Sequence, residues 1–193
     1  MNRVLKVNMD TLFPVILSVP EKKKQLRGRE RVAFLSRFAR RAVERSSQKT
    51  GVLLGHLNKN KKGAPLPSGK FHWSISHKPE YVIGVVSLEK IGIDIEKFRP
   101  YSKGLEKKVG DIKEWNLCKS DRSELLFRYW TAKEAVLKAE GMGLSGLSAC
   151  KIVKVIDETN LIVNFRNQNR LIEHFFCKNH VAAIVKDNHR VEW

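Results

Sequence analysis

The segment that most constrains the fold is residues 121–140, which the sequence predicts as one long helix. Asp121 is followed three residues later by Glu124, close to a capping box, and Gly141 and Gly143 end the segment. Apolar side chains recur along it with the 3.6-residue period of a helix. They are Leu125, Leu126, Tyr129, Ala132, Val136 and Leu137. We therefore expect this helix to be the major one of the second half of the chain.

One flank of this helix carries polar residues that could serve a site. Trp130, Glu134 and Lys138 follow one another at intervals of four, so they share a flank, and Lys133 is adjacent to Glu134. A glutamate and a lysine four residues apart are most often a weak surface pair. Trp130 is more typical of a packing anchor than of a ligand contact. The flank alone therefore identifies no function.

Two further carboxylates come from a predicted strand upstream, at residues 91–95. Apolar and polar residues alternate there, which sends Asp94 and Glu96 to one face and the isoleucines to the other. Neighbouring carboxylates repel unless a cation lies between them, and a hard cation such as Mg²⁺ prefers oxygen ligands. The same pattern also occurs on solvated strand faces. The strand therefore indicates a metal site only in combination with other segments.

The order of the remaining elements predicts an α+β protein. A strand is expected within residues 1–19, a helix over 21–45 and a short helix over 50–57, followed by a loop over 58–69. Strands are expected at 70–76, 81–87 and 91–95, then one or two short helices within 97–120. After the helix at 121–140, strands are expected at 151–157, 161–166, 171–177 and 180–186. Helix followed by strands thus occurs twice, which favours a pseudo-duplicated fold.

The charge is strongly positive, with a formal net charge of +17 and a pI of about 10.0. Its excess is concentrated early, in Lys22, Lys23, Lys24, Arg27, Arg29, Arg31, Arg37, Arg40, Arg41 and Arg45. Such a field attracts polyanions, and nucleic acid is the general first hypothesis. No helix-turn-helix, RNA-recognition aromatic signature or zinc finger supports it. A Mg²⁺-dependent nuclease and a non-enzymatic basic RNA-binding protein remain as alternatives.

The sequence predicts neither membrane insertion nor secretion. No stretch of about twenty apolar residues is present, and the N-terminal residues lack the pattern of a signal peptide, so we expect none. Cys118, Cys150 and Cys177 are odd in number and lack metal-ligand spacing. We therefore expect reduced thiols in a cytoplasmic protein.

In combination, the motifs resemble those of the 4′-phosphopantetheinyl transferase family. Gly-Ile-Asp-Ile-Glu at residues 92–96 is followed by Trp-x-x-Lys-Glu-Ala-x-x-Lys at residues 130–138. Upstream, residues 74–77 are similar to the family's Ser-x-Ser-His segment, and residues 63–65 to the Gly-x-Pro element of its larger, surfactin-synthetase-activating branch. The resemblance covers roughly residues 27–147. The chain departs from the pattern at Ala64, where many relatives carry lysine, and at Lys78-Pro79.

The resemblance implies two similar lobes, residues 1–97 and 98–193, with the active site and coenzyme A between them. Each lobe would be a helix packed on a small, mainly antiparallel sheet. The implied reaction moves 4′-phosphopantetheine from coenzyme A to a serine of an apo acyl or peptidyl carrier protein, releasing 3′,5′-ADP. Coenzyme A and acidic carriers would account for the positive charge, and nucleic acid becomes an unlikely partner. A pseudo-duplicated chain of this size should work as a monomer.

The resemblance also implies roles for individual residues. Asp94 and Glu96 would meet Glu134 across the lobe boundary and bind Mg²⁺, and Glu134 would also help to deprotonate the serine. Lys138 would contact the phosphates, and Lys133 would either do the same or point to solvent. The expected contacts to the adenosine 3′-phosphate are Ser76, His77 and Arg31.

Residues 97–117 are the expected docking surface for the carrier. They combine apolar side chains with lysines, which suits an acidic helix that has an apolar stripe. The alternative is that Leu105 and Trp115 simply cover the core. The apolar members are Phe98, Tyr101, Leu105 and Trp115, and the lysines are Lys103, Lys107, Lys108 and Lys113.

Overall fold

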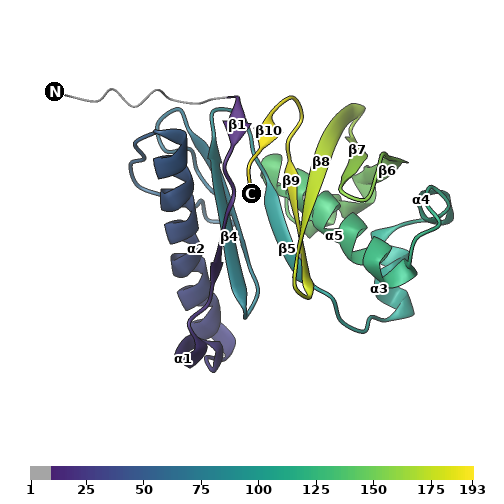
Figure 1. Ribbon diagram of the computed structural model, residues 1–193, viewed down its shortest axis with the longest axis horizontal. Coiled ribbons are helices and arrows are strands. Elements are labelled where there is room, and N and C mark those ends of the chain that lie inside the picture. The colour runs from purple at the N-terminus through teal and green to yellow at the C-terminus, as the bar shows by residue number, and fades with distance from the viewer. Residues whose placement is uncertain (1–9) are drawn as a thin grey trace. The chain divides into compact units, whose positions relative to one another are not determined.

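The computed structural model of the chain describes residues 10–193, which form two compact α+β units (Figure 1). Unit 1 contains the chain up to Lys90 and the last residues, Asn188–Trp193, and unit 2 contains Ile91–Asp187. In each unit a long helix packs on an antiparallel sheet. The predicted fold class is therefore confirmed.

Unit 1 is built on helix α2 (Gly28–Thr50) and a three-stranded antiparallel sheet of order β2-β4-β3. Its strands are β2 (Val15–Ser18), β3 (His72–His77) and β4 (Tyr81–Ser87), and helix α1 (Glu21–Lys24) precedes α2. The stripe of Leu35, Ala39 and Val43 turns toward the sheet and is buried. A two-residue parallel pair, β1 (Thr11–Leu12) with β10 (Arg190–Val191), joins the two chain segments of this unit.

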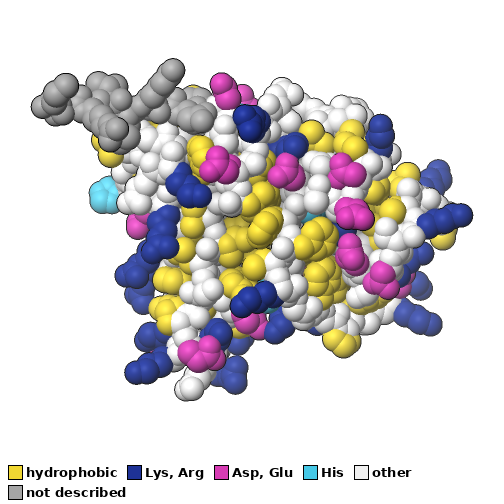
Figure 2. Space-filling model, viewed as in Figure 1, with side chains coloured by type: hydrophobic (Ala, Val, Ile, Leu, Met, Phe, Trp, Pro, Cys, Tyr) yellow, Lys and Arg dark blue, Asp and Glu magenta, His cyan; other side chains and the backbone are white. Residues whose placement is uncertain are grey.

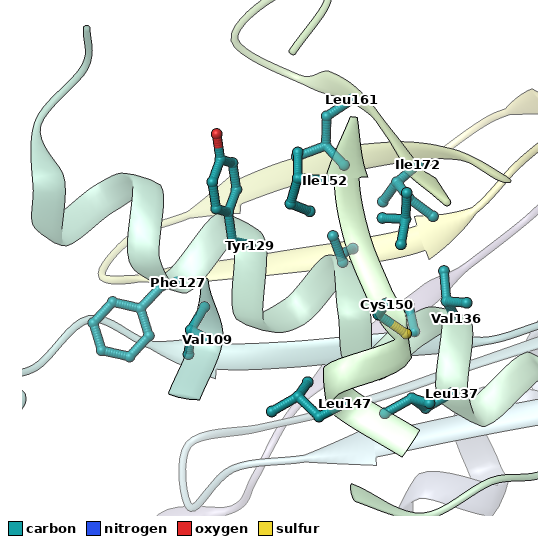
Figure 3. Packing of buried hydrophobic residues seen from close by; sticks show 14 of the residues in the cluster. Val109, Phe127, Tyr129, Val136, Leu137, Leu147, Cys150, Ile152, Leu161 and Ile172 are labelled. Carbon is teal, nitrogen blue, oxygen red and sulfur yellow. The ribbon is translucent and has the colours of Figure 1, made fainter. Parts of the chain in front are cut away.

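Unit 2 is built on helix α5 (Arg122–Ala139) and a five-stranded antiparallel sheet of order β5-β9-β8-β7-β6. The strands are β5 (Ile93–Lys97), β6 (Cys150–Val155), β7 (Asn160–Phe165), β8 (Gln168–Cys177) and β9 (His180–Val185). Short helices α3 (Lys103–Val109) and α4 (Ile112–Trp115) precede α5, and a 3₁₀ helix (Leu144–Ala149) follows it. Figure 3 shows the core, where Tyr129 and Val136 of α5 lie among Ile152, Leu161 and Ile172 of the sheet.

The division between the units lies after Lys90, seven residues before the boundary predicted at residue 97. Strand β5 causes the shift, because it pairs with β9 along its whole length and therefore belongs to unit 2. Asp94, Glu96 and Glu134 consequently all lie in one unit. The expectation that they meet across the boundary is corrected.

The helix predicted over residues 50–57 is wrong. Helix α2 ends at Thr50 because Gly51 adopts the left-handed conformation, with φ of 78°, and its N–H bonds the carbonyls of Gln48 and Ser47. The helix predicted over 21–45 is interrupted at residues 25–27 and then runs on to Thr50. None of the helices described in residues 10–193 is both long and apolar enough to cross a membrane.

Candidate active site

Three carboxylates from two elements of unit 2 converge. Asp94 and Glu96 project from β5 and Glu134 projects from α5, and one oxygen of each lies within 4.8 Å of the others. Asp94 and Glu96 are buried, with 2% and 4% of their surface exposed, and Glu134 is half-buried. Such a cluster is electrostatically unfavourable without nearby positive charge.

Gly92 explains how the helix comes close enough to the strand. It lies one residue before β5, directly beneath the backbone of α5. A Cβ at this position would lie 1.8 Å from the carbonyl oxygen of Ala135 and 2.7 Å from the nitrogen of Ala139. Any side chain here would push α5 away from β5 and separate Glu134 from the other two carboxylates. This role of Gly92 was not predicted from the sequence, where a glycine close to two acids was the available signal.

Within residues 10–193, Lys138 and Arg99 are cationic side chains that contact the cluster. Lys138 donates from Nζ to Asp94 Oδ1 at 2.6 Å, and Arg99 donates from Nη1 to Glu96 Oε2 at 3.0 Å. Lys138 follows Glu134 by one helical turn, so it lies on the flank that the sequence predicted. Arg99 was missed, and its position just after the strand that carries Glu96 was the only signal for it. The carboxylates are thus partly compensated by the chain's own cations.

Trp130 is more than the packing anchor that the sequence predicted. Its ring is partly buried against the core of unit 2, as expected. Its indole Nε1–H also donates to Glu96 Oε1 at 3.1 Å. Trp130, Glu134 and Lys138 therefore all reach the carboxylate cluster from one flank of α5.

Lys133 does not join this group, and its predicted contact with phosphate is contradicted. Only 2% of the residue is exposed, and its Nζ donates to the carbonyl of Val109 at 2.7 Å and to Glu114 Oε1. Consecutive helical residues point about 100° apart, so Lys133 enters the core while Glu134 faces the cluster. Burial lowers the pKa of Lys133, and the hydrogen bond and charge of Glu114 oppose that change.

The residues present fit a magnesium ion. Three carboxylates supply hard oxygen ligands, and Mg²⁺ commonly takes only a few protein ligands and completes its octahedral shell with water and phosphate oxygens. The partly open position of Glu134 leaves room for such non-protein ligands. Asp94, Glu96 and Glu134 are therefore the residues that could hold it.

The predicted coenzyme residues of unit 1 occupy two elements. Ser76 and His77 end β3, where Ser76 is buried and His77 is half-buried. Arg31 lies on α2 and lines a hollow of about 640 Å³ together with Arg29, Val32 and Ser36. Their contacts with a 3′-phosphate stay predictions.

The surface of unit 1 is the more basic one. Figure 2 shows Lys and Arg side chains gathered over α1 and α2. Arg37, Arg41 and Arg45 are exposed at intervals of four along α2, and therefore form one row. This face suits an anionic partner.

The docking surface predicted for residues 97–117 needs one correction. Trp115 is buried and stacks on Tyr129, with ring centroids 5.1 Å apart, so it is a core residue and no anchor for a partner. Phe98, Tyr101 and Leu105 pack partly buried against the same core. The four lysines of the segment are exposed, and Ile112, 69% exposed, is the apolar side chain that stands among them.

Comparison with known proteins agrees with the geometry. Residues 90–192, more than half of the chain, match the sequence profile of the 4′-phosphopantetheinyl transferase superfamily. The chain is 35% identical over 78 residues to 4′-phosphopantetheinyl transferase ffp of Bacillus subtilis, covering 38% of this chain and 35% of that protein. It is 33% identical over 103 residues to the transferase HetI of Nostoc sp., covering 47% and 44%. It is 30% identical over 108 residues to L-aminoadipate-semialdehyde dehydrogenase-phosphopantetheinyl transferase of Rattus norvegicus, covering 46% and 35%. The matches span less than half the length of these relatives.

Proposed function

Because the chain belongs to the 4′-phosphopantetheinyl transferase superfamily, we propose that it transfers 4′-phosphopantetheine from coenzyme A to a serine of an apo carrier protein. The second product is 3′,5′-ADP. The observation that carries the proposal is the cluster of Asp94, Glu96 and Glu134, which lies within the segment that matches the family.

Transfer at phosphorus needs mainly carboxylates that hold a cation and a lysine beside them. Two negatively charged partners must meet at a phosphorus atom, so catalysis depends on charge neutralisation and alignment. Asp94, Glu96 and Glu134 would hold Mg²⁺, which would neutralise charge on the pyrophosphate. Lys138 lies beside this cluster, and its ammonium group can move from Asp94 to the oxygen on which charge develops.

The bond changes balance without a further reactant. The serine oxygen bonds to the phosphorus that carries the pantetheine arm, and the bond from that phosphorus to the bridging oxygen breaks. The serine proton passes to Glu134 or to a water that Glu134 orients. The leaving group departs as 3′,5′-ADP, with Lys138 close to its negative charge.

Ser76, His77 and Arg31 are the proposed contacts to the 3′-phosphate. A contact far from the reacting phosphorus stabilises ground and transition states equally, so His77→Ala should raise the KM for coenzyme A more than it lowers kcat. Dephospho-coenzyme A tests this directly. The wild type should discriminate against it, and the variant should not.

The carrier is the proposed protein partner, and the cytoplasm the expected location. Fatty-acid, polyketide and nonribosomal-peptide carriers are all candidates. We expect the chain to act on them as a monomer.

The test is an assay with a panel of apo-carriers, coenzyme A and Mg²⁺, read by intact mass. Addition of one phosphopantetheine arm to at least one carrier, and no addition in excess EDTA, is the expected result. A duplex DNA and a structured RNA are incubated in parallel. Hydrolysis of nucleic acid with every carrier unchanged would instead support the nuclease, which the same carboxylates could serve.

A further inference from the structure

Glu96 is held at both of its carboxylate oxygens. Trp130 donates from Nε1 to Oε1 at 3.1 Å, and Arg99 donates from Nη1 to Oε2 at 3.0 Å. Glu96 is only 4% exposed, so solvent contributes little to its orientation. The two donors therefore help to set the direction in which the carboxylate oxygens point.

Arg99 and Trp130 differ in how they affect the binding of a cation beside Glu96. Arg99 carries a positive charge and has half of its side chain exposed, at 51%, so its ion pair is screened and it also repels a metal. The indole of Trp130 is neutral and partly buried. It can therefore orient Glu96 without repelling a cation. An indole nitrogen can only donate a hydrogen bond, so it cannot itself bind the metal in place of the carboxylate.

Trp130 also connects two of the three carboxylates. It lies one turn before Glu134 on α5, and it contacts Glu96 on β5. Gly92 keeps this helix and this strand in backbone contact. The rotamer of Glu96 is thereby tied to the helix that presents Glu134.

We propose that Trp130 is a positioning residue that orients Glu96 for the divalent cation. The inference rests on the proposed function, because it assumes that the three carboxylates bind a metal. Hydrogen-bonding partners of metal ligands commonly contribute about 10–100-fold to metal affinity. The indole N–H of Trp130 belongs at the lower end of that range, because Arg99 still holds the other oxygen.

The test compares two tryptophan-to-phenylalanine variants of the whole chain by Mn²⁺ binding, followed by electron paramagnetic resonance of the free ion. Trp130→Phe retains an aromatic ring and loses the N–H, and its Kd for Mn²⁺ should rise by about tenfold. Trp115→Phe is the matched control. Trp115 lies in the same unit, but its N–H donates to the carbonyl of Gly110 and not to a carboxylate. The control should bind Mn²⁺ like the wild type.

A second measurement follows metal binding on the wild type, and variants serve only to assign its resonances. The chain has 4 tryptophans, so a ¹⁵N-labelled wild type gives 4 indole N–H resonances, which single replacements assign. Titration with Mg²⁺ should move the resonance of Trp130 and leave that of Trp115 in place. High Mn²⁺ should also restore transfer by Trp130→Phe toward the wild-type rate, which a purely structural defect would not allow.

The outcomes separate this inference from the proposed function. If the wild type transfers phosphopantetheine and binds Mn²⁺, while Trp130→Phe binds it equally well and the Trp130 resonance stays fixed, the positioning role is refuted and the transferase stands. If the wild type binds no divalent cation and modifies no carrier, the proposed function fails together with the inference.

Discussion

The two units share an architecture but differ in net charge and in whether their cationic side chains are exposed or buried. Unit 1 contains 20 Lys and Arg against 7 Asp and Glu, a net charge of +13, whereas unit 2 contains 17 against 13, a net charge of +4. Helix α2 leaves a row of arginines in solvent, whereas α5 buries most of its length, including Lys133 and Arg128. Unit 1 is thus suited to attract anions, and unit 2 to fix charged groups in place.

The shared architecture is visible in how helix meets sheet. In unit 1, a Cβ on Gly84 of β4 would lie 2.7 Å from the nitrogen of Val43 on α2. In unit 2, Gly92 meets Ala135 of α5 in the same way. Both units therefore use a glycine where the central helix crosses the sheet, which is physical support for the predicted duplication. Only the second crossing is flanked by carboxylates.

The largest expected effect comes from the carboxylates of unit 2. Asp94→Ala should lower the rate of transfer by about 10³-fold or more, because it removes one of the three proposed metal ligands. Glu158→Ala, which removes an exposed carboxylate in the same unit, is the control and should be silent. Rates are followed by intact mass of the carrier. An Asp94→Ala enzyme that keeps near-wild-type activity would contradict the placement of the chemistry in unit 2.

Lys133 should matter for stability and not for coenzyme binding. Lys133→Met removes the nearer cation of buried Glu114 and leaves it Lys151 Nζ at 3.9 Å, and breaking a buried pair on one side costs about 3–5 kcal/mol of the free energy of unfolding. Urea denaturation measures this loss, and exposed Lys108→Met should show almost none of it. The double variant with Glu114→Gln should recover part of the loss. If Lys133→Met is instead stable and has a raised KM for coenzyme A, the result would support the phosphate contact that the sequence predicted.

The core of unit 2 should also make the protein sensitive to acid. Burial, and then the charge of Arg128, lower the pKa of His174 from its usual 6.5 to about 4. Hydrogen bonds to the carbonyls of Arg128 and Thr159 favour the charged form and oppose this shift. The unfolded chain binds a proton below pH 6.5 and the folded chain does not until about pH 4, so stability falls across this window on acidification. The loss approaches about 3 kcal/mol. The check is urea denaturation between pH 7 and 4, in which His174→Gln should be less sensitive to pH.

The smallest expected effect is that of charge reversal on carrier association, which tests which of the two units docks the carrier. Reversing the charge of Lys107 and Lys108 in unit 2 should slow association with an acidic carrier several-fold at low salt, and the effect should shrink as salt rises. The same reversal at Arg41 and Arg45 of unit 1 is the matched comparison. If only the second pair slows modification, with the KM for coenzyme A unchanged, the basic row on α2 is the docking surface.

Local pattern predicted most of the fold. The apolar period and the Asp121 cap predicted α5, and the cap is present, since Asp121 accepts from the Glu124 N–H at 2.9 Å. Strands were likewise expected where β3 to β9 lie, with alternation as the evidence at residues 91–95. Sequence did not reveal that β5 pairs with β9, because that pairing joins residues far apart in the chain. The domain boundary was displaced for this reason.

Residue types at helical and strand spacing predicted which side chains could form the candidate site. They predicted less well where each side chain points. Asp94, Glu96, Glu134 and Lys138 come together as expected. Lys133 does not, because Glu114, which is distant in sequence, offers it a partner in the core. The contacts of Trp130 and Arg99 with Glu96 depend on how closely α5 and β5 approach, and pattern alone carries no information on that distance.

Under the proposed function, Asp94, Glu96 and Glu134 together hold the cation on which transfer depends. Crystals grown with Mn²⁺ and coenzyme A test this through the anomalous scattering of the metal. We expect one peak within about 2.0–2.3 Å of an oxygen from each of the three carboxylates, with pyrophosphate and water oxygens completing the shell. A peak elsewhere, or coenzyme A bound with no metal at these residues, would contradict it.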